Sequence, residues 1–248
     1  GENAENPIKL MQERKDIQTK NYFLMNAAAN IHFTKHLTFT VKGDYQTINV
    51  RNLSYAKAGL YDYTENNGGY ADISNAVSKR WSTEEYFSYN RSFFNDAWKA
   101  SFVLGASWYY TRSESSSSGS EQFFDDSFDY FNLGAGSVTH NPSSGMDEQS
   151  MNSYYFRMNH NLFNRYMFGF TFRADGASNF GANNKFGYFP SGSFAWVMSE
   201  EPFFEPAKDV MNNLKFRVSY GKTGNAGIPN YRTISQYGTG QTIMNNTQ

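Results

Sequence analysis

Apolar and polar side chains alternate at every second position in several segments of this 248-residue sequence, and this pattern most restricts its fold. The clearest case is the segment from Tyr166 to Asp175. One row holds Tyr166, Phe168, Phe170, Phe172 and Ala174, and the other holds Met167, Gly169, Thr171, Arg173 and Asp175. Successive side chains of a strand point to opposite faces, whereas a helix requires a period of 3.6. The pattern predicts a β-strand with one apolar face and one polar face.

Seven further segments fit the same description, so the sequence predicts roughly eight strands. Leu214 to Gly221, Trp98 to Tyr110 and Leu37 to Thr47 alternate clearly. Weaker alternation covers 22–33, 83–93, 154–163 and 189–198. In Trp98 to Tyr110 the apolar row begins and ends with aromatic rings, as expected of the aromatic girdles at the two surfaces of a membrane.

The predicted connections are of two lengths. Thr34 to His36, Phe94 to Ala97 and Phe163 to Arg165 are tight turns, and Glu200 to Asn213 is a longer turn on the same side. The stretches 49–80 and 111–149 are predicted to be long loops, with Ser115 to Ser118 as a solvated, flexible tip. Outer-membrane barrels have short periplasmic turns and long extracellular loops, so the sequence predicts an antiparallel up-and-down transmembrane β-barrel.

Composition agrees with an all-β chain that has one apolar and one wet face. Aromatic residues make up 18% of the sequence, although the hydrophobic total is only 39% and the mean hydropathy is −0.67. The formal net charge of −1 gives no electrostatic reason to expect a nucleic-acid partner. The sequence contains no cysteine, which excludes disulfides, thiolate metal sites and cysteine nucleophiles.

No apolar run reaches the ~18 residues of a membrane helix, and residues 1–6 do not resemble a signal peptide. We therefore expect an exported protein whose targeting sequence lies upstream of the chain.

The residues that usually carry chemistry do not form a recognisable site. His32, His36, His140 and His160 are scattered, and Asp125, Asp126 and Asp129 lack the spacing of an EF-hand. Calcium is therefore a weaker interpretation of the three aspartates than a solvated acidic loop. The pairs Glu84–Glu85 and Glu200–Glu201 point to opposite faces if they lie on strands, so neither forms a paired-carboxylate site. We predict no catalytic, cofactor or metal site.

Aromatic residues in the predicted loops allow two interpretations. They are Tyr61, Tyr63, Tyr70, Phe123, Phe124, Phe128, Tyr130 and Phe131. Exposed rings stack on the apolar faces of sugars, but rings in loops also pack against neighbouring loops or a partner, which we favour slightly. The substrate-binding residues stay unknown at this stage.

From Phe172 onward the sequence reads FRADGASNFGANNKFGYFPSGSFAWVMSEEPFF and later LKFRVSYGKTGNAGIPNY. It resembles the SusC/RagA family of TonB-linked outer-membrane proteins of the Bacteroidetes. The matching elements are Arg173, Asp175, Gly176, Ser178, Phe180 and Gly181, then Gly187–Ser191, Ser193, Trp196 and Ser199–Glu201, and finally Leu214–Asn225 with Ile228, Asn230 and Tyr231. Ala177 replaces the usual first serine. Upstream, YFNLGAG at 130–136 is similar to the family's N-N-L-G-x-G loop.

The resemblance implies that residues 1–248 are part of a barrel of about 22 strands, without the plug domain. It further implies an outer-membrane importer of oligosaccharides or peptides that requires no cofactor. Its expected partners are a SusD-like surface lipoprotein, the TonB–ExbB–ExbD system acting on the plug, and outer-membrane lipid.

Three expectations about individual residues follow from the sequence itself. Inward-facing cations are expected to line the plug interface or the solute path, by alternation alone: Lys42, Lys99, Arg157, Arg173, Lys215 and Arg217. In the loop motif, Arg173, Asp175 and Lys185 are expected to brace the wall rather than contact solute. The glycines and asparagines of that motif are predicted to adopt positive φ angles: Gly176, Gly181, Gly187, Asn179, Asn183 and Asn184. A small self-contained barrel for adhesion or anchoring and a soluble carbohydrate-binding β-sandwich stay open as alternatives.

Overall fold

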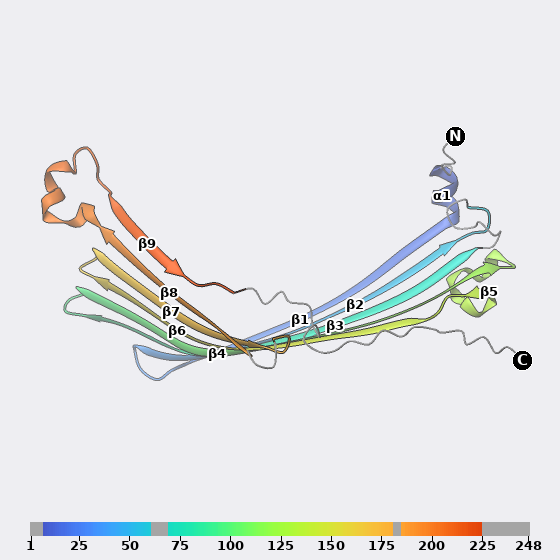
Figure 1. Cartoon of the computed structure of the whole chain (residues 1–248), viewed down its shortest axis with the longest axis horizontal. Helices are drawn as coiled ribbons and strands as arrows, with labels where there is room; N and C mark the ends of the chain where they lie inside the picture. Colours follow the sequence, from blue (N-terminus) through green and yellow to red (C-terminus); the bar gives the residue numbers. More distant parts are fainter. Residues whose placement is uncertain (1–6, 61–68, 181–184, 225–248) are drawn as a thin grey trace, which may run out of the picture. The chain divides into compact units, whose positions relative to one another are not determined.

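A computed structural model describes residues 7–60, 69–180 and 185–224 of the chain. The described part consists almost entirely of antiparallel strands joined in chain order (Figure 1). The strands are β1 Arg14–His32, β2 Leu37–Ala56, β3 Tyr70–Phe93, β4 Trp98–Phe123, β5 Gly136–Thr139, β6 Ser143–Leu162, β7 Tyr166–Ala177, β8 Phe186–Val197 and β9 Lys215–Gly221. The helical segments are α1 Pro7–Glu13 and the 3-10 turns η2 Asp126–Phe131, η3 Leu133–Ala135, η4 Met198–Glu200 and η5 Pro202–Ala207.

The strands form one nine-stranded sheet in the order β1-β2-β3-β4-β6-β7-β8-β9, with β5 paired to β4. All eight predicted strands are present, and the up-and-down order is confirmed. The alternative of a β-sandwich would need a second sheet facing the first, and the described residues contain only this one. None of the described helices has the length and apolar character of a membrane span.

Register keeps the two faces of the sheet separate from strand to strand. Phe168 of β7 lies opposite His160 of β6 and Phe194 of β8, and Phe194 in turn lies opposite Val218 of β9. Gly169, one position on, lies opposite Asn159 and Ser193. A slip by one residue would exchange the faces, so the alternation seen in the sequence fixes the pairing.

The short turns are confirmed, and the backbone of two of them is left-handed. Phe94, Asn95 and Asp96 have φ angles of 53°, 53° and 66°, and Phe163 and Asn164 have 55° and 54°. In contrast, Gly176, Gly187 and Asn179 do not have the positive φ angles that the sequence predicted. Gly181, Asn183 and Asn184 lie outside the described residues.

Gly176 and Gly187 are required because neighbouring rings leave no room for a Cβ atom, and not because their backbone has a positive φ angle. A Cβ atom on Gly176 would lie 2.8 Å from the ring of Phe186, and one on Gly187 would lie 2.7 Å from the ring of Phe189. Each glycine therefore makes room for an aromatic side chain on the sheet.

The predicted long loops exceed the loops of the structure, because the strands continue into them. β2, β3, β4 and β6 contain 20, 24, 26 and 20 residues. A membrane-spanning strand needs only about 9–11 residues. The run Ser115 to Ser118, predicted as a flexible tip, lies inside β4. Serine lacks a strong strand preference, so only pairing with neighbouring strands reveals this extension.

The described chain divides into two compact units. Unit 1 comprises Gly1–Ala27, Gly43–Ser82 and Tyr109–Glu148, and unit 2 comprises Ala28–Lys42, Thr83–Trp108 and Gln149–Gln248. Unit 2 contains the short turns and the strongly alternating strand segments. Unit 1 contains the long strand extensions and a small buried core of Tyr55, Ala71 and Phe123, against which Phe128, Tyr130, Leu133 and Ala135 pack.

Candidate functional site: the two faces of the wall

The outward row of unit 2 is a continuous surface of exposed apolar side chains. Phe170 retains 36% of its accessible surface and Val218 retains 53%, and Phe168, Phe172 and Phe216 are similarly exposed. Their rings meet across strands, with centroids of Phe168 and Phe194 5.1 Å apart. Soluble monomers rarely expose such a surface, whereas lipid covers it at no cost.

Aromatic pairs stack between β3 and β4 in each unit. In unit 2, Phe93 and Trp98 stack beside a short turn with ring centroids 4.7 Å apart. In unit 1, the ring centroids of Trp81 and Tyr110 are 5.9 Å apart. The predicted girdles of β4 thus have partners on β3, as expected of rings at two membrane–water interfaces.

Glu201 forms a polar node beside the short turns, and the sequence analysis did not identify it. Its carboxylate accepts hydrogen bonds from the Tyr166 hydroxyl at 2.5 Å, from Trp196 Nε1 at 2.9 Å and from Arg165 at 3.3 Å. Only 7% of Glu201 is exposed. The hydrogen bonds from Tyr166 and Trp196 hold the pKa of Glu201 below its ordinary value. Glu200, its neighbour, is exposed, so the two carboxylates do not act as a pair.

The spacing between the tryptophan and the S-E-E motif now has a structural explanation. The chain leaves β8 at Val197 and turns through η4, which brings Glu201 back to the ring of Trp196. The node anchors the return connection to the end of the sheet. A conspicuous W-x-x-S-E-E run was the signal available in the sequence, but the contact itself depends on the 3-10 turn.

The inward row of unit 2 carries a polar network that links four strands. Lys42 of β2 pairs with Glu84 of β3 at 3.4 Å, and the Tyr155 hydroxyl of β6 donates to the same carboxylate at 2.8 Å. Arg173 of β7 lies over the Tyr155 ring, 6.0 Å from its centroid, and pairs with Asp175 at 2.7 Å. The bracing role expected for Arg173 and Asp175 agrees with this pairing. Lys185 is exposed and directly precedes the first residue of β8.

Gly105 lets Tyr155 reach Glu84 across the intervening strand β4. A Cβ atom on Gly105 would lie 2.6 Å from Cζ and Oη of Tyr155 and 2.7 Å from Cβ of Tyr86. The tyrosine ring therefore lies directly on the glycine backbone. The sequence alternation placed Gly105 on the inner face but could not indicate which side chain covers it.

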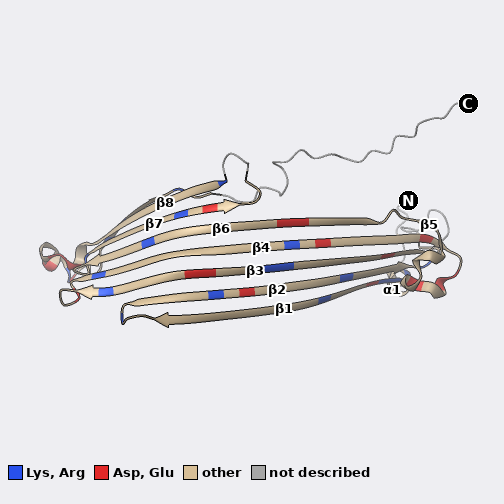
Figure 2. Ribbon diagram, turned by 90° about the horizontal axis from the view of Figure 1, so that it is seen from below, with Lys and Arg blue, Asp and Glu red and all other residues tan. Residues whose placement is uncertain are grey.

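The remaining inward cations lie outside this network. Lys99 and Arg217 line a cavity of about 930 Å³ on the inner face, together with asparagine and serine side chains. Lys215 lies nearby, with its amine 3.3 Å from the sulfur of Met167, and Arg157 lies opposite Thr171 in the register. Figure 2 shows how sparse the charged positions are along the ribbons.

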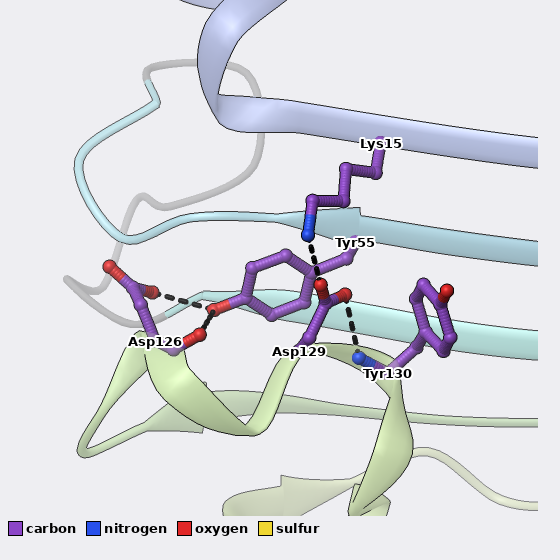
Figure 3. A network of polar contacts seen from close by, with 5 residues as sticks. All are labelled: Lys15, Tyr55, Asp126, Asp129 and Tyr130. Carbon is purple, nitrogen blue, oxygen red and sulfur yellow. Dashed lines mark hydrogen bonds and ion pairs between the residues drawn. The ribbon is translucent and has the colours of Figure 1, made fainter.

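The acidic cluster of unit 1 is a structural element rather than a solvated loop. Asp125 caps η2 by accepting from Ser127 N, and Asp126 accepts a 2.7 Å hydrogen bond from the Tyr55 hydroxyl (Figure 3). Asp129 is 8% exposed and pairs with Lys15. Burial, followed by the hydrogen bond to Asp126, raises the pKa of Tyr55. The solvated interpretation is therefore wrong for Asp129.

The loop aromatics fall into two groups. Phe123 is buried and Phe128 and Tyr130 pack against it, in agreement with loop packing. Phe124 and Phe131 are 82% and 80% exposed. Tyr70 lies 5.5 Å from the ring of His140, and Tyr61 and Tyr63 lie outside the described residues.

The four histidines do not converge. His32 contacts Thr38, His36 contacts the Asn90 carbonyl, His160 accepts from Trp98 Nε1, and His140 lies 3.7 Å from Glu121. In the described ranges, three or more His, Cys, Asp or Glu side chains nowhere gather as a metal ion would require.

An antiparallel meander with an apolar outer row, aromatic girdles and a polar inner row defines the wall of a transmembrane β-barrel. A scan against models of protein families gives no match. TonB-dependent receptor P3 of Formosa agariphila is 31% identical over the whole chain, which spans 24% of that protein. TonB-dependent receptor SusC of Bacteroides thetaiotaomicron is 43% identical over 76 residues, which are 31% of this chain and 8% of SusC.

The solved structures of the RagAB peptide transporter have the same fold. One aligns with a TM-score of 0.78 at 21% identity over 90% of this chain and 24% of the matched chain. Another, the RagAB peptide importer in the "open-open" state, aligns with a TM-score of 0.80. The chain belongs to the TonB-dependent receptors of the SusC and RagA type. It spans about a quarter of the length of the receptors it matches end to end.

Proposed function

We propose that this chain forms barrel wall and extracellular extensions in an outer-membrane importer driven by TonB. The observation that carries the proposal is the collinear match of the whole chain to a TonB-dependent receptor, in a sheet whose outer row is apolar. In this proposal the chain supplies part of a barrel of about 22 strands. The proposal also includes a plug domain and a signal peptide in the full-length receptor.

The topology supports a larger barrel over the self-contained small one. β1 and β9 stand at the two ends of the sheet path, and a small closed barrel would require them to pair. Within the described residues their outer edges have no partner strand. Unpaired backbone groups are costly in lipid, so further strands are expected on both sides.

The strand extensions of unit 1 support an elaborate extracellular side. β4 continues for 13 residues beyond the girdle residue Tyr110, through Arg112, Glu114 and a run of serines. Such residues belong in water. We propose that the fold held by Lys15–Asp129 and Tyr55–Asp126 presents Phe124 and Phe131 to a SusD-like surface lipoprotein or to arriving solute.

The proposed cargo is an oligosaccharide or a peptide too large for porins. The name SusC belongs to a relative by sequence and RagAB is called a peptide transporter, so both cargo classes occur among similar proteins. The relatives that match are named as receptors, and we assign the chain no catalytic role and no cofactor.

Uptake measurements in cells test this function. A strain that lacks the receptor gene is given the wild-type gene, with TonB intact or depleted, and is supplied with labelled maltooligosaccharides or a labelled peptide mixture. We expect accumulation of one cargo class, abolished by TonB depletion. Uptake that persists without TonB, or a gene product without a plug domain, would contradict the proposal.

A further inference from the structure

The inner face of unit 2 consists of a filled stretch and a hollow stretch. In the filled stretch, Tyr155 covers Gly105 and stands beside Tyr86 and Arg173. In the hollow stretch, glycine and serine stand among the inward residues. Gly169 is covered by the short side chain of Ser193 instead of a ring, because a Cβ atom there would lie 2.6 Å from the hydroxyl of Ser193. The small residues leave the groove of about 930 Å³ in the wall.

The two stretches also differ in charge. The filled stretch is neutralised internally, because Lys42 pairs with Glu84 and Arg173 with Asp175. Three cationic residues line the groove, Arg91, Lys99 and Arg217, and none of its described lining residues is an aspartate or a glutamate. The guanidinium of Arg91 lies over the Phe93 ring, 4.9 Å from its centroid, so Lys99 of β4 and Arg217 of β9 are the cations of the inward row. The inward polar lining of the groove consists of Lys99, Arg217, Asn90, Asn159, Asn161, Ser92, Ser101, Ser193 and Ser219.

Neither inward cation of the groove has an anionic partner in the part of the chain that the structure describes. Lys99 donates only to the amide oxygen of Asn164, at 3.4 Å. The described ion pairs include neither Lys99 nor Arg217. A cation that loses water without gaining an anion is strongly destabilising, so a filled lumen requires a counter-charge here.

We propose that this groove is the seat of aspartate or glutamate side chains of the plug domain. The proposal rests on the proposed function, since it requires a plug in the lumen. Carboxylates are the groups that an arginine fork and a lysine amine bind best, and the surrounding amides and hydroxyls complete the hydrogen bonding.

The position of the groove favours the plug over passing cargo. Lys99 is the second residue of β4 and Asn161 the second-last of β6, so the groove adjoins the short turns. Short turns face the periplasm in barrels of this kind. A fixed partner there neutralises the cations permanently, whereas cargo would leave them uncompensated after each release.

Zero-length cross-linking of the full-length receptor in outer membranes tests this contact directly. A carbodiimide joins an amine to a carboxylate only where the two touch, with loss of water. We expect mass spectrometry to find Lys99 joined to an aspartate or glutamate of the plug. The Lys42–Glu84 pair is the internal positive control, because its charged atoms are 3.4 Å apart. Lys99→Arg keeps the charge but cannot form the amide, so the plug product should disappear.

Three outcomes would overturn the inference. They are a Lys99 that stays unmodified while Lys42 is cross-linked, a Lys99 joined to a wall carboxylate, and a Lys99 joined to bound cargo. TonB-dependent uptake by the wild-type receptor is measured in parallel. Uptake without the Lys99–plug product refutes only the groove, whereas loss of TonB dependence refutes the proposed function.

Charge reversal gives a second, quantitative test. In the double variant Lys99→Glu with Arg217→Glu, hydrogen exchange in the cross-linked plug segment should accelerate roughly tenfold or more, which corresponds to about 1.4 kcal/mol. Lys79→Glu reverses one charge at an exposed position of β3 in unit 1 and should leave that exchange unchanged. Equal exchange in the double variant and the wild type would contradict the proposal.

Discussion

Gly105→Ala is expected to destabilise the barrel because it displaces Tyr155. The new methyl would lie 2.6 Å from Tyr155 Cζ and Oη, about 0.8 Å short of the 3.4 Å at which ordinary contact begins. The ring must move, and a shift of that size stretches the 2.8 Å hydrogen bond to Glu84 beyond 3.5 Å. Overpacking costs about 1–3 kcal/mol, and a hydrogen bond to a charged group is worth about 1.5–3 kcal/mol. Because Glu84 keeps Lys42 and is partly solvated, we expect a total of roughly 2–3 kcal/mol.

The assay is denaturant unfolding of the full-length receptor in phospholipid, followed by the shift between folded and unfolded bands on unheated gels. A mutant cycle with Tyr155→Ala isolates the ring. Without the ring, Gly105→Ala should lower the free energy of unfolding much less. The remaining loss comes from the contact at 2.7 Å to Tyr86 Cβ. Glycine in a strand is itself unfavourable by about 0.5–1 kcal/mol, which reduces the remainder further. An equal cost of Gly105→Ala in both backgrounds would refute the argument that the glycine exists to admit the ring.

Three further predictions concern the outer row, the node and the unit 1 loop. Phe170→Arg should cost about 2–4 kcal/mol in lipid, whereas Thr171→Arg, on the inner face, should cost much less; equal costs in the same gel assay would contradict the assignment of faces. The lowered pKa of Glu201 stabilises the fold above the ordinary glutamate pKa of 4.5, and this contribution is lost as pH falls through the lower folded pKa. Glu201→Gln should therefore flatten the pH dependence of the unfolding midpoint below pH 4.5. Parallel pH profiles of the variant and the wild type would rule out the node as the source of that dependence. Tyr55→Phe removes the hydrogen bond to Asp126 and should lower the free energy of opening of the 124–135 loop by about 1 kcal/mol. Limited proteolysis of that loop should then be roughly fivefold faster. Unchanged cleavage would show that the bond does not hold the loop.

Prediction from sequence succeeded where a local pattern determines structure. The segment from Tyr166 to Asp175 alternates without interruption, and β7 has the expected faces and register. It failed where the local pattern is weak. Ser115 to Ser118 has no alternation to read, and its strand exists because β3 and β6 supply partners on either side.

The sites were less predictable than the strands. Alternation correctly placed Lys42 and Lys99 among the candidate inward cations, but it could not separate a paired lysine from one in an open groove. The three aspartates at 125–129 were recognised as a cluster, and their separate roles were not. Asp129 even adopts a φ of 52°, which no property of its neighbours in the sequence indicates.

The sequence by itself determined the class of fold, the face of each strand residue in unit 2, the short turns and the family resemblance. These depend on a period of two and on ordered motifs, which are properties of neighbouring residues. The tertiary structure alone decided that Tyr155 crosses Gly105 to reach Glu84 and that Glu201 meets Tyr166 and Trp196. Those contacts join residues 5 to 71 positions apart, and their geometry is set by strand register and turn conformation rather than by any one segment.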